Sequence, residues 1–323
     1  MTRRARRQGR TILHRDEPPP AEGPQAEAAP AELKRIEARL EEELGDAVAD
    51  LQLAALEMGS TATTRIHRAT MSEGAALLVE VRLEGSDDLR AGTADQRLVA
   101  DLLSGHPLVE IALPVDSLST AAVRTTQDPG GQTLTEARVA SEEARRDWAE
   151  ALWRLSFGTL RRNGLALSGL DPTLLRFLPH GRVAIVRLGP VEHVEPVAIE
   201  WYEALIRAAQ GGEEASVQSA LDDLGGAAPP SWYQPRRDGD AEISSLVEPA
   251  GPDLPPAARP LDRLHLMVGR LLEELDARPP IHDVMAELWW GAPPTTPSGE
   301  AEAEWWKSRA TLSLLDRLGD RSE

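Results

Sequence analysis

The segment 158–191 restricts the fold of this chain more than any other part of its sequence. It begins where a helical pattern ends, passes through a loop that carries Asp171-Pro172, and then contains two short apolar runs. The runs flank the tripeptide Pro179-His180-Gly181, and such a turn between runs of strand length predicts a β-hairpin. Arg187-Leu188-Gly189 follows the second run directly. A helix, a loop and a short hairpin are therefore expected in close succession.

The sequence before this segment predicts a small sheet. Apolar residues recur at helical spacing from Leu33 to Leu51, which indicates one or two amphipathic helices with a break near Gly45. A second helical pattern covers 87–103. The polar stretch 127–132 contains Asp128-Pro129-Gly130-Gly131, a strong turn signal that predicts a boundary between two lobes. Strands are predicted as two pairs, 64–69 with 76–83 and 108–113 with 121–126.

Helical patterns dominate the rest of the chain, which gives an α+β fold with a small antiparallel sheet followed by a mostly helical part. A long helix is predicted over 140–162, with Trp148 and Leu152 on its apolar side. The Pro- and Gly-rich stretch 225–260 predicts an irregular connection. The other helices are predicted near 195–210, 213–224, 260–275, 281–289 and 300–318.

Composition excludes several classes of function. The chain has no cysteine, which excludes disulfides, thiolate metal sites and cysteine nucleophiles. No apolar run is long enough for a transmembrane helix, so a cytoplasmic location is expected. The net charge is −18, and the first fifteen residues carry six arginines without an acid, so residues 16–323 carry about −24. Such a body repels nucleic acid, whereas the Arg-rich tip is either a solvated tail or a contact for an acidic partner or RNA.

Several short strings, in this order and spacing, resemble the UbiB/AarF family of atypical kinase-like proteins. GSTATTRIHRAT at 59–70 is similar to a small-residue loop of that family, and GAALLVEVRLEG at 74–85 is similar to its strand that carries the nucleotide-binding lysine. RRNGL at 161–165 resembles the string before the family's catalytic loop. The resemblance runs from about residue 38 to about residue 285. It implies a two-lobed protein-kinase-like fold with a small antiparallel-sheet N-lobe and a mostly helical C-lobe.

The groups that phosphoryl transfer requires are replaced at the positions that match the family. Glu80 stands at the strand lysine and Arg187 at the metal-binding Asp of Asp-Phe-Gly. Counting back from Arg187 puts the catalytic Asp at Gly169 and the magnesium Asn at Leu174; a shift of two residues would use Asp171 instead. Because phosphoryl transfer needs a lysine on the phosphates and acids on magnesium, the substitutions predict neither catalysis nor binding of ATP and magnesium.

The same substitutions suggest a structural role for two of the replaced positions. In a kinase-like cleft the strand lysine and the metal-binding Asp face each other, and here an acid and a base have exchanged places. We therefore expect either a Glu80–Arg187 ion pair that closes an empty cleft or two side chains that point to solvent. No metal site is predicted, because none of the seven histidines forms a helical zinc motif.

Four regions are expected from these patterns. They are a disordered Arg- and Pro-rich tail over 1–31, an N-lobe over 32–127, a helical C-lobe over 128–290, and a C-terminal helix after a Pro-rich break over 291–323. Tryptophan pairs lie at Trp289-Trp290 and Trp305-Trp306. Because buried aromatic anchors are frequent at protein interfaces, we expect the first pair to hold the C-lobe together and Trp305 and Trp306 to bind a partner subunit.

Two functions from different classes follow. The first is a catalytically inactive, pseudokinase-like protein that binds another protein as a scaffold or regulatory subunit, with a homo-oligomer as a further form. The alternative is a divergent enzyme that still binds ATP or an isoprenoid-like lipid and uses Asp171 or Asp128 in new roles. No cofactor is expected under the first hypothesis.

Overall fold

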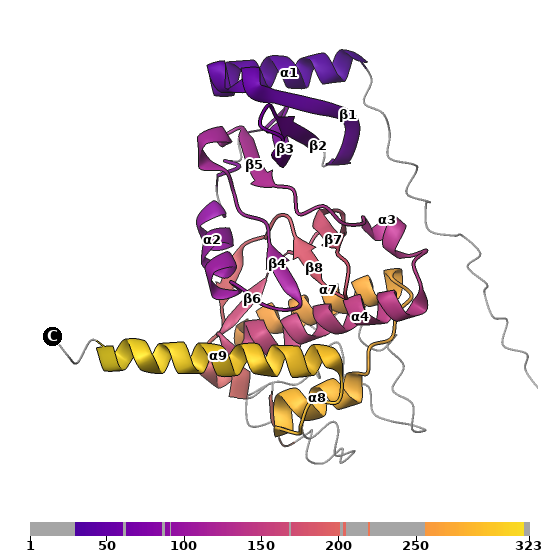
Figure 1. The fold of residues 1–323 in the computed structure, drawn as a ribbon, viewed down its shortest axis with the longest axis vertical. Coiled ribbons are helices and arrows are strands. Elements are labelled where there is room, and N and C mark those ends of the chain that lie inside the picture. The colour runs from indigo at the N-terminus through magenta and orange to yellow at the C-terminus, as the bar shows by residue number, and fades with distance from the viewer. Residues whose placement is uncertain are drawn as a thin grey trace, which may run out of the picture.

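The computed structural model describes residues 30–60, 63–85, 88–90, 92–167, 169–200, 203–204, 219 and 256–319. They form a small sheet-containing lobe stacked on a larger, mostly helical lobe (Figure 1). This arrangement confirms the predicted α+β class with a small antiparallel sheet before the helices. The predicted disordered tail falls almost entirely outside the described residues, and the first helix, α1, covers Pro30–Leu44.

The sheet of the small lobe has four strands in the order β1–β2–β3–β5, and every neighbouring pair is antiparallel. The strands predicted at 64–69, 76–83 and 121–126 are confirmed with slightly different ends. Their bounds are Thr64–Met71 for β2, Ala76–Arg82 for β3 and Val123–Gln127 for β5.

The edge strand β1, Leu51–Ser60, corrects the sequence analysis, which extends the helical pattern as far as Leu51. The helix ends at Gly45, whose φ of 57° lies in the left-handed region that only glycine adopts without strain. A 3₁₀ turn, Gly45–Asp50, then leads into the strand. Pairing with β2, a contact that helical periodicity does not register, decides the conformation of these residues.

The two faces of this sheet have different environments because successive side chains of a strand point to opposite sides. One face carries Leu77, Val79 and Val81 and packs under α1, which contributes Ile36 and Leu40 from one side of the helix. All five side chains are buried. The opposite face is directed toward the large lobe.

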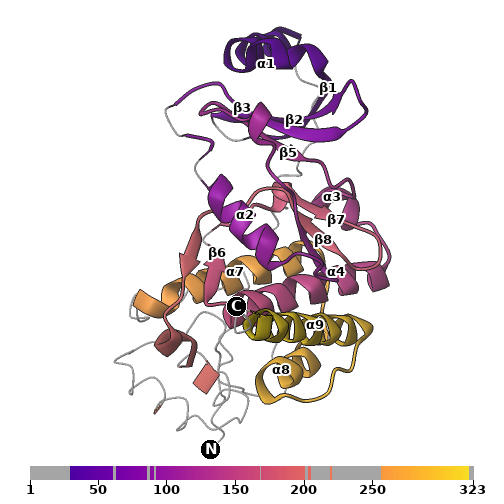
Figure 2. The same cartoon turned by 60° about the vertical axis from the view of Figure 1, so that its left-hand side comes forward.

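Helix α2, Thr93–Leu102, and strand β4, Val109–Ile111, connect the sheet to the large lobe (Figure 2). The prediction that 108–113 pairs with 121–126 is wrong. Instead, β4 pairs in parallel with β8 of the large lobe, while β5 pairs with β3. Parallel pairing between segments far apart in sequence depends on how the lobes dock, which local patterns do not specify.

The large lobe begins after the turn at Asp128-Pro129-Gly130-Gly131. Both glycines have positive φ, 70° and 84°, which agrees with the predicted turn. A Cβ at Gly131 would lie 2.9 Å from the Phe177 carbonyl oxygen, so only glycine fits this close approach. The short helix α3, Leu134–Ala137, follows with a complete capping box between Thr133 and Glu136.

The predicted hairpin in 158–191 is present. Its strands are β7, Leu175–Phe177, and β8, Val183–Ile185, joined through His180 and Gly181 with φ of 60° and 69°. Outside it, β6, Leu165–Leu167, pairs with β9, Val191–His193.

Helices form the core of the large lobe. The predicted long helix is α4, Glu142–Arg154, which continues into a π-helical turn, Leu155–Leu160. The bounds of the other helices are Arg259–Glu274 for α7, Ile281–Trp290 for α8 and Pro297–Gly319 for α9. Most of the predictions over 195–260 lie outside the described residues. None of the described helices has the length and apolar composition needed to cross a bilayer.

A buried ionic cluster attaches α8 and α9 to α4. The Arg154 guanidinium donates to both carboxylate oxygens of Glu287 at 2.9 and 2.7 Å, to Glu150 at 2.7 Å and to Glu302 at 3.2 Å. Thr159 donates a further hydrogen bond of 2.6 Å to Glu302. Although burial opposes its charged form, the hydrogen bonds to Glu287 and Glu150 raise the pKa of Arg154. The cluster therefore joins α4, α8 and α9, although α4 is far from the other two helices in the sequence.

Candidate functional site in the cleft between the lobes

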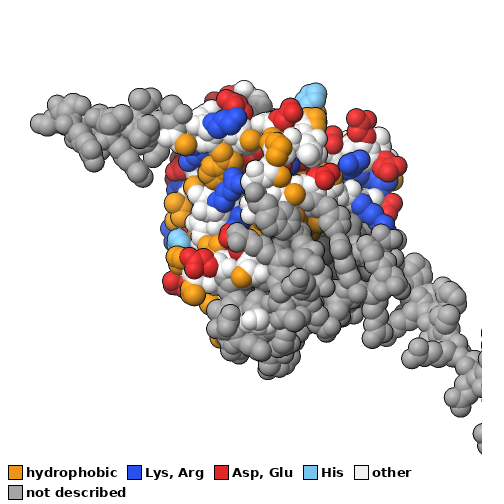
Figure 3. Space-filling model, turned by 90° about the horizontal axis from the view of Figure 1, so that it is seen from below, with side chains coloured by type: hydrophobic (Ala, Val, Ile, Leu, Met, Phe, Trp, Pro, Cys, Tyr) orange, Lys and Arg blue, Asp and Glu red, His pale blue; other side chains and the backbone are white. Residues whose placement is uncertain are grey.

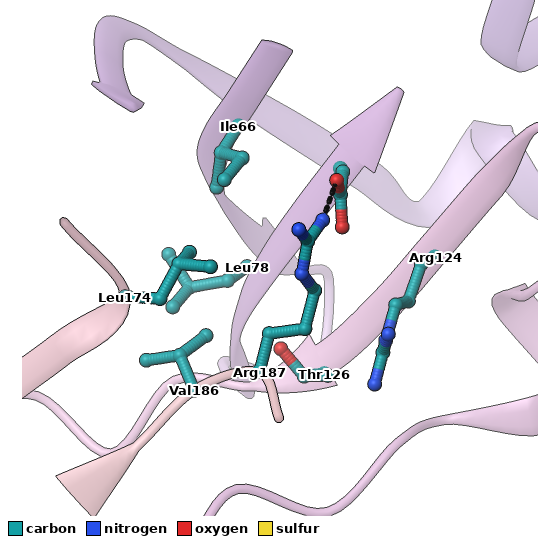
Figure 4. A pocket seen from close by; sticks show the side chains of 8 residues that line it. Ile66, Leu78, Arg124, Thr126, Leu174, Val186 and Arg187 are labelled. Carbon is teal, nitrogen blue, oxygen red and sulfur yellow. Dashed lines mark hydrogen bonds and ion pairs between the residues drawn. The ribbon is translucent and has the colours of Figure 1, made fainter. Parts of the chain in front are cut away.

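The lower face of the small sheet and the β7–β8 hairpin enclose a cleft between the lobes (Figure 4). The sheet contributes alternate residues of its strands, which the period of two places on one face. From the large lobe, one residue comes from the turn before β7 and two follow β8 directly. The lining residues are Ile66, Leu78, Glu80, Arg124, Thr126, Leu174, Val186 and Arg187.

Apolar side chains of both lobes fill half of this cleft. Ile66 and Leu78 of the small lobe pack against Leu174 and Val186 of the large lobe, and all four are buried. The cavity that remains has a volume of about 10 Å³, which is room for about one water molecule. A bound base or other ring would have to displace this cluster.

The predicted ion pair between Glu80 and Arg187 is confirmed. Glu80 lies on β3 with only 6% of its side chain exposed, whereas 28% of the Arg187 side chain is exposed. The pair joins β3 of the small lobe to the segment after β8 of the large lobe, and Figure 4 marks it with a dashed line from Arg187. Removing one partner would leave the other without its counter-charge in a largely buried position.

Arg124 is a charged lining residue that the sequence analysis does not identify. It lies directly opposite Glu80 in the β3–β5 register and is 4% exposed. Its guanidinium donates to the Gln96 side-chain oxygen, and its Nε has no acceptor among the described residues. Burial lowers the pKa of Arg124 to about 10, and the neighbouring Arg187 acts in the same direction while Glu80 opposes it.

Gln96 of α2, also absent from the sequence analysis, fixes the back of the cleft. Its fully buried amide donates to the carbonyl oxygens of Ala112 at 2.5 Å and Val186 at 3.0 Å. The hydrogen bonds tie α2 to segments beside β4 and β8. The sequence contains one indication that Arg124 belongs to the cleft: if 76–83 pairs with 121–126, Arg124 lies near Glu80. No sequence pattern indicates that Gln96 belongs there.

The other predicted cleft positions have structural roles. Gly169 accepts a 3.2 Å hydrogen bond from the Gly189 N–H, and a Cβ at Gly189 would lie 2.7 Å from the Gly169 oxygen. Asp171 accepts hydrogen bonds from the Thr173 N–H and hydroxyl at 2.9 and 2.8 Å, so it caps the turn Pro172–Leu174. Leu174 lines the cleft, whereas Gly169 and Asp171 are not among its lining residues.

The tryptophans of α8 and α9 lie away from this cleft. Trp289 is buried, and the Arg161 guanidinium lies 4.2 Å from the centre of its ring. Trp305 packs edge-on against His106 with ring centres 4.5 Å apart and donates to the Ser104 carbonyl oxygen at 3.2 Å. Trp305 therefore has contacts within the chain, and a partner-binding role for Trp305 and Trp306 stays a prediction.

Comparisons with known proteins show the fold. The sequence matches no protein-family profile and no curated protein sequence. Rv3197 from Mycobacterium tuberculosis, whose structure was solved as a complex with erythromycin, is similar with a TM-score of 0.61 and 19% identity, over 79% of this chain and 82% of that chain. A Stt7 homologue from Micromonas algae, soaked with ATP, reaches a TM-score of 0.31 and 12% identity over 46% of this chain and 52% of that chain. The chain has a two-lobed α+β architecture with the sheet in the small lobe, and it shares its fold with Rv3197.

Proposed function

We propose that this protein is a catalytically inactive, pseudokinase-like member of the UbiB/AarF type that works by binding another protein, as a scaffold or regulatory subunit. The observation that carries the proposal is the closed cleft. Ile66, Leu78, Leu174 and Val186 fill its apolar half, and the Glu80–Arg187 pair spans the other half.

The charges in the cleft also oppose kinase chemistry. Magnesium is held by oxygen ligands from acids and amides, and the transferred phosphoryl group is held by a cation on the small lobe. By the resemblance, Arg187 stands at the family's metal-binding Asp and Glu80 at its strand lysine, so each would repel the group that it would have to hold. Leu174, where the family has an amide, offers no ligand.

The surface of the large lobe outside the cleft is compatible with the binding of a protein partner. The large lobe ends in the helices α8 and α9, which lie below α4 in both ribbon views (Figures 1 and 2). Seen from below, the described surface carries acidic, basic and apolar side chains interspersed (Figure 3). Non-obligate interfaces are about as apolar as the rest of a protein surface, so this composition is compatible with a protein interface.

The test is magnesium-dependent nucleotide binding and turnover. We expect calorimetry with ATP and MgCl₂ to show no heat that depends on magnesium, and we expect no release or transfer of the γ-phosphate. The matched comparison is the variant that combines Glu80→Lys, Leu174→Asn and Arg187→Asp, which restores the charge pattern of an active cleft. Magnesium-dependent binding or turnover by the natural chain would contradict the proposal and favour the alternative of a divergent ATP- or lipid-binding enzyme.

A further inference from the structure

Three charged side chains meet at the open half of the cleft, and only one of them is an acid. Glu80, Arg124 and Arg187 line the same cavity and carry a net charge of +1. The whole chain, in contrast, has a net charge of −18. The cleft is therefore a local concentration of positive charge in an acidic protein.

Arg124 has no carboxylate partner among the described residues. Its only hydrogen-bond acceptor there is the neutral side-chain oxygen of Gln96, and its Nε is buried without an acceptor. Arg154, the other buried arginine with many contacts, has three glutamates around it. Because a buried charge is costly unless it is paired, Arg124 depends on the nearby Glu80 carboxylate, which forms its ion pair with Arg187.

Glu80 can serve either arginine. It contacts Arg187 in this structure, and it also lies opposite Arg124 on the adjacent strand. One carboxylate thus stands between two guanidinium groups, and the arginine that it does not contact has no carboxylate hydrogen bond among the described residues. Arg187, with 28% of its side chain exposed, is the one that an incoming ion can reach.

We propose that the cleft binds a phosphate group without a metal ion, held by the Arg187 guanidinium while Glu80 moves to pair with Arg124. Guanidinium groups bind phosphate oxygens through paired, charge-assisted hydrogen bonds, and a singly charged phosphate would balance the net charge of +1 that the three side chains carry. No bond is formed or broken in this step. The site would be a binding site for an anion and not a catalytic centre.

The size of the cavity limits the ligand. About 10 Å³ is free, so the phosphate group enters only as Arg187 turns toward solvent. The apolar cluster of Ile66, Leu78, Leu174 and Val186 stays closed and leaves no room for a nucleobase. We therefore expect inorganic phosphate and a small phosphate monoester to bind, and metal-free ATP to bind no more tightly than pyrophosphate.

The test measures thermal unfolding of the full chain against increasing sodium phosphate, with sodium chloride at the same ionic strength as the reference. A ligand that binds only the folded state raises the melting temperature with the logarithm of its concentration above Kd. We expect this rise in the natural chain, its loss in Arg187→Gln, and its retention in Arg182→Gln. Arg182 is a suitable control because it is exposed and forms a separate ion pair with Glu110 at 2.6 Å.

Arg124→Leu provides a second readout. Because it removes a buried charge without a partner, we expect this variant to melt at or above the temperature of the natural chain in chloride and to lose the response to phosphate. If it fails to fold, the broadening of the ³¹P resonance of phosphate by the natural chain, compared with Arg187→Gln, decides the question. Glycerol 3-phosphate in place of inorganic phosphate distinguishes an ester from the free ion.

Two results would overturn the proposal. One is an equal rise of the melting temperature in all variants, which is the general effect of phosphate as an excluded salt. The other is the absence of any difference between phosphate and chloride. Neither result would affect the proposed lack of catalysis, since that proposal depends on magnesium-dependent binding and turnover.

Discussion

At the scale of single residues, Arg154 shows how one buried charge organises a lobe. It is fully buried, and its donors engage Glu150, Glu287 and Glu302 from three helices. Replacing a buried ion pair as a whole can be neutral, but removing one partner leaves the others uncompensated. Glu302 also lies 3.6 Å from His106, whereas Glu150 and Glu287 have no other cation in the described contacts of this cluster.

We expect Arg154→Met to lower the free energy of unfolding by about 3–5 kcal/mol, because the substitution leaves three buried carboxylates without their common cation. Urea unfolding followed by circular dichroism measures the change. Arg146→Met is the matched control, because Arg146 is an exposed residue of the same helix, and its effect should stay within about 0.5 kcal/mol. Equal effects of the two substitutions would mean that the cluster does not stabilise the lobe.

At the scale of elements, α9 is held to the lobe by the first part of its length. Glu302 contacts Arg154 and Thr159, and Trp305 contacts His106 and Ser104. These contacts favour an internal clamp for Trp305 in addition to any role in an interface. The helix continues to Gly319 beyond these anchors.

We expect deletion of 292–323 to lower the melting temperature clearly, because it removes Glu302 and Trp305 and exposes the apolar surface that they cover. Deletion of 311–323 alone keeps both anchors and should leave the melting temperature nearly unchanged. Differential scanning calorimetry measures stability, and analytical ultracentrifugation measures association. A long deletion that leaves stability unchanged but abolishes a dimer would make the segment an interface and not a clamp.

At the scale of the whole molecule, the cleft residues fix the two lobes relative to each other. The apolar cluster of Ile66, Leu78, Leu174 and Val186 and the Glu80–Arg187 pair both bridge the lobes. Side chains of both lobes fill the space between them and leave a cavity of about 10 Å³.

We expect Glu80→Lys to destabilise the closed arrangement, because it places three cations around one cavity. Adding Arg187→Glu should restore part of the loss, since the exchanged pair has opposite charges again, with a coupling energy of about 1–3 kcal/mol in a double-mutant cycle. The free energies come from urea unfolding, and small-angle scattering reports the separation of the lobes. A double variant no more stable than the sum of the single changes would show that the pair does not join the lobes.

Sequence patterns determined the parts of this fold that depend on neighbours along the chain. Short runs typical of strands predicted β2 and β3, the Pro-x-Gly turn predicted the β7–β8 hairpin, and helical spacing predicted α4. The exchange of charges at Glu80 and Arg187 predicted their contact as one of two outcomes, because the resemblance supplied the fold that places them together.

Tertiary structure decided the features that depend on contacts between distant segments. The extended conformation of β1 requires β2, and β4 pairs with β8 only because the lobes dock as they do. Likewise, Arg124 is a buried cation with no acid partner in the described structure only once β5 lies beside β3 and α2 covers it. Periodicity indicates which side of a segment is apolar. It does not indicate which other segment packs against that side, because the free energy that selects the packing partner comes from contacts across the whole chain.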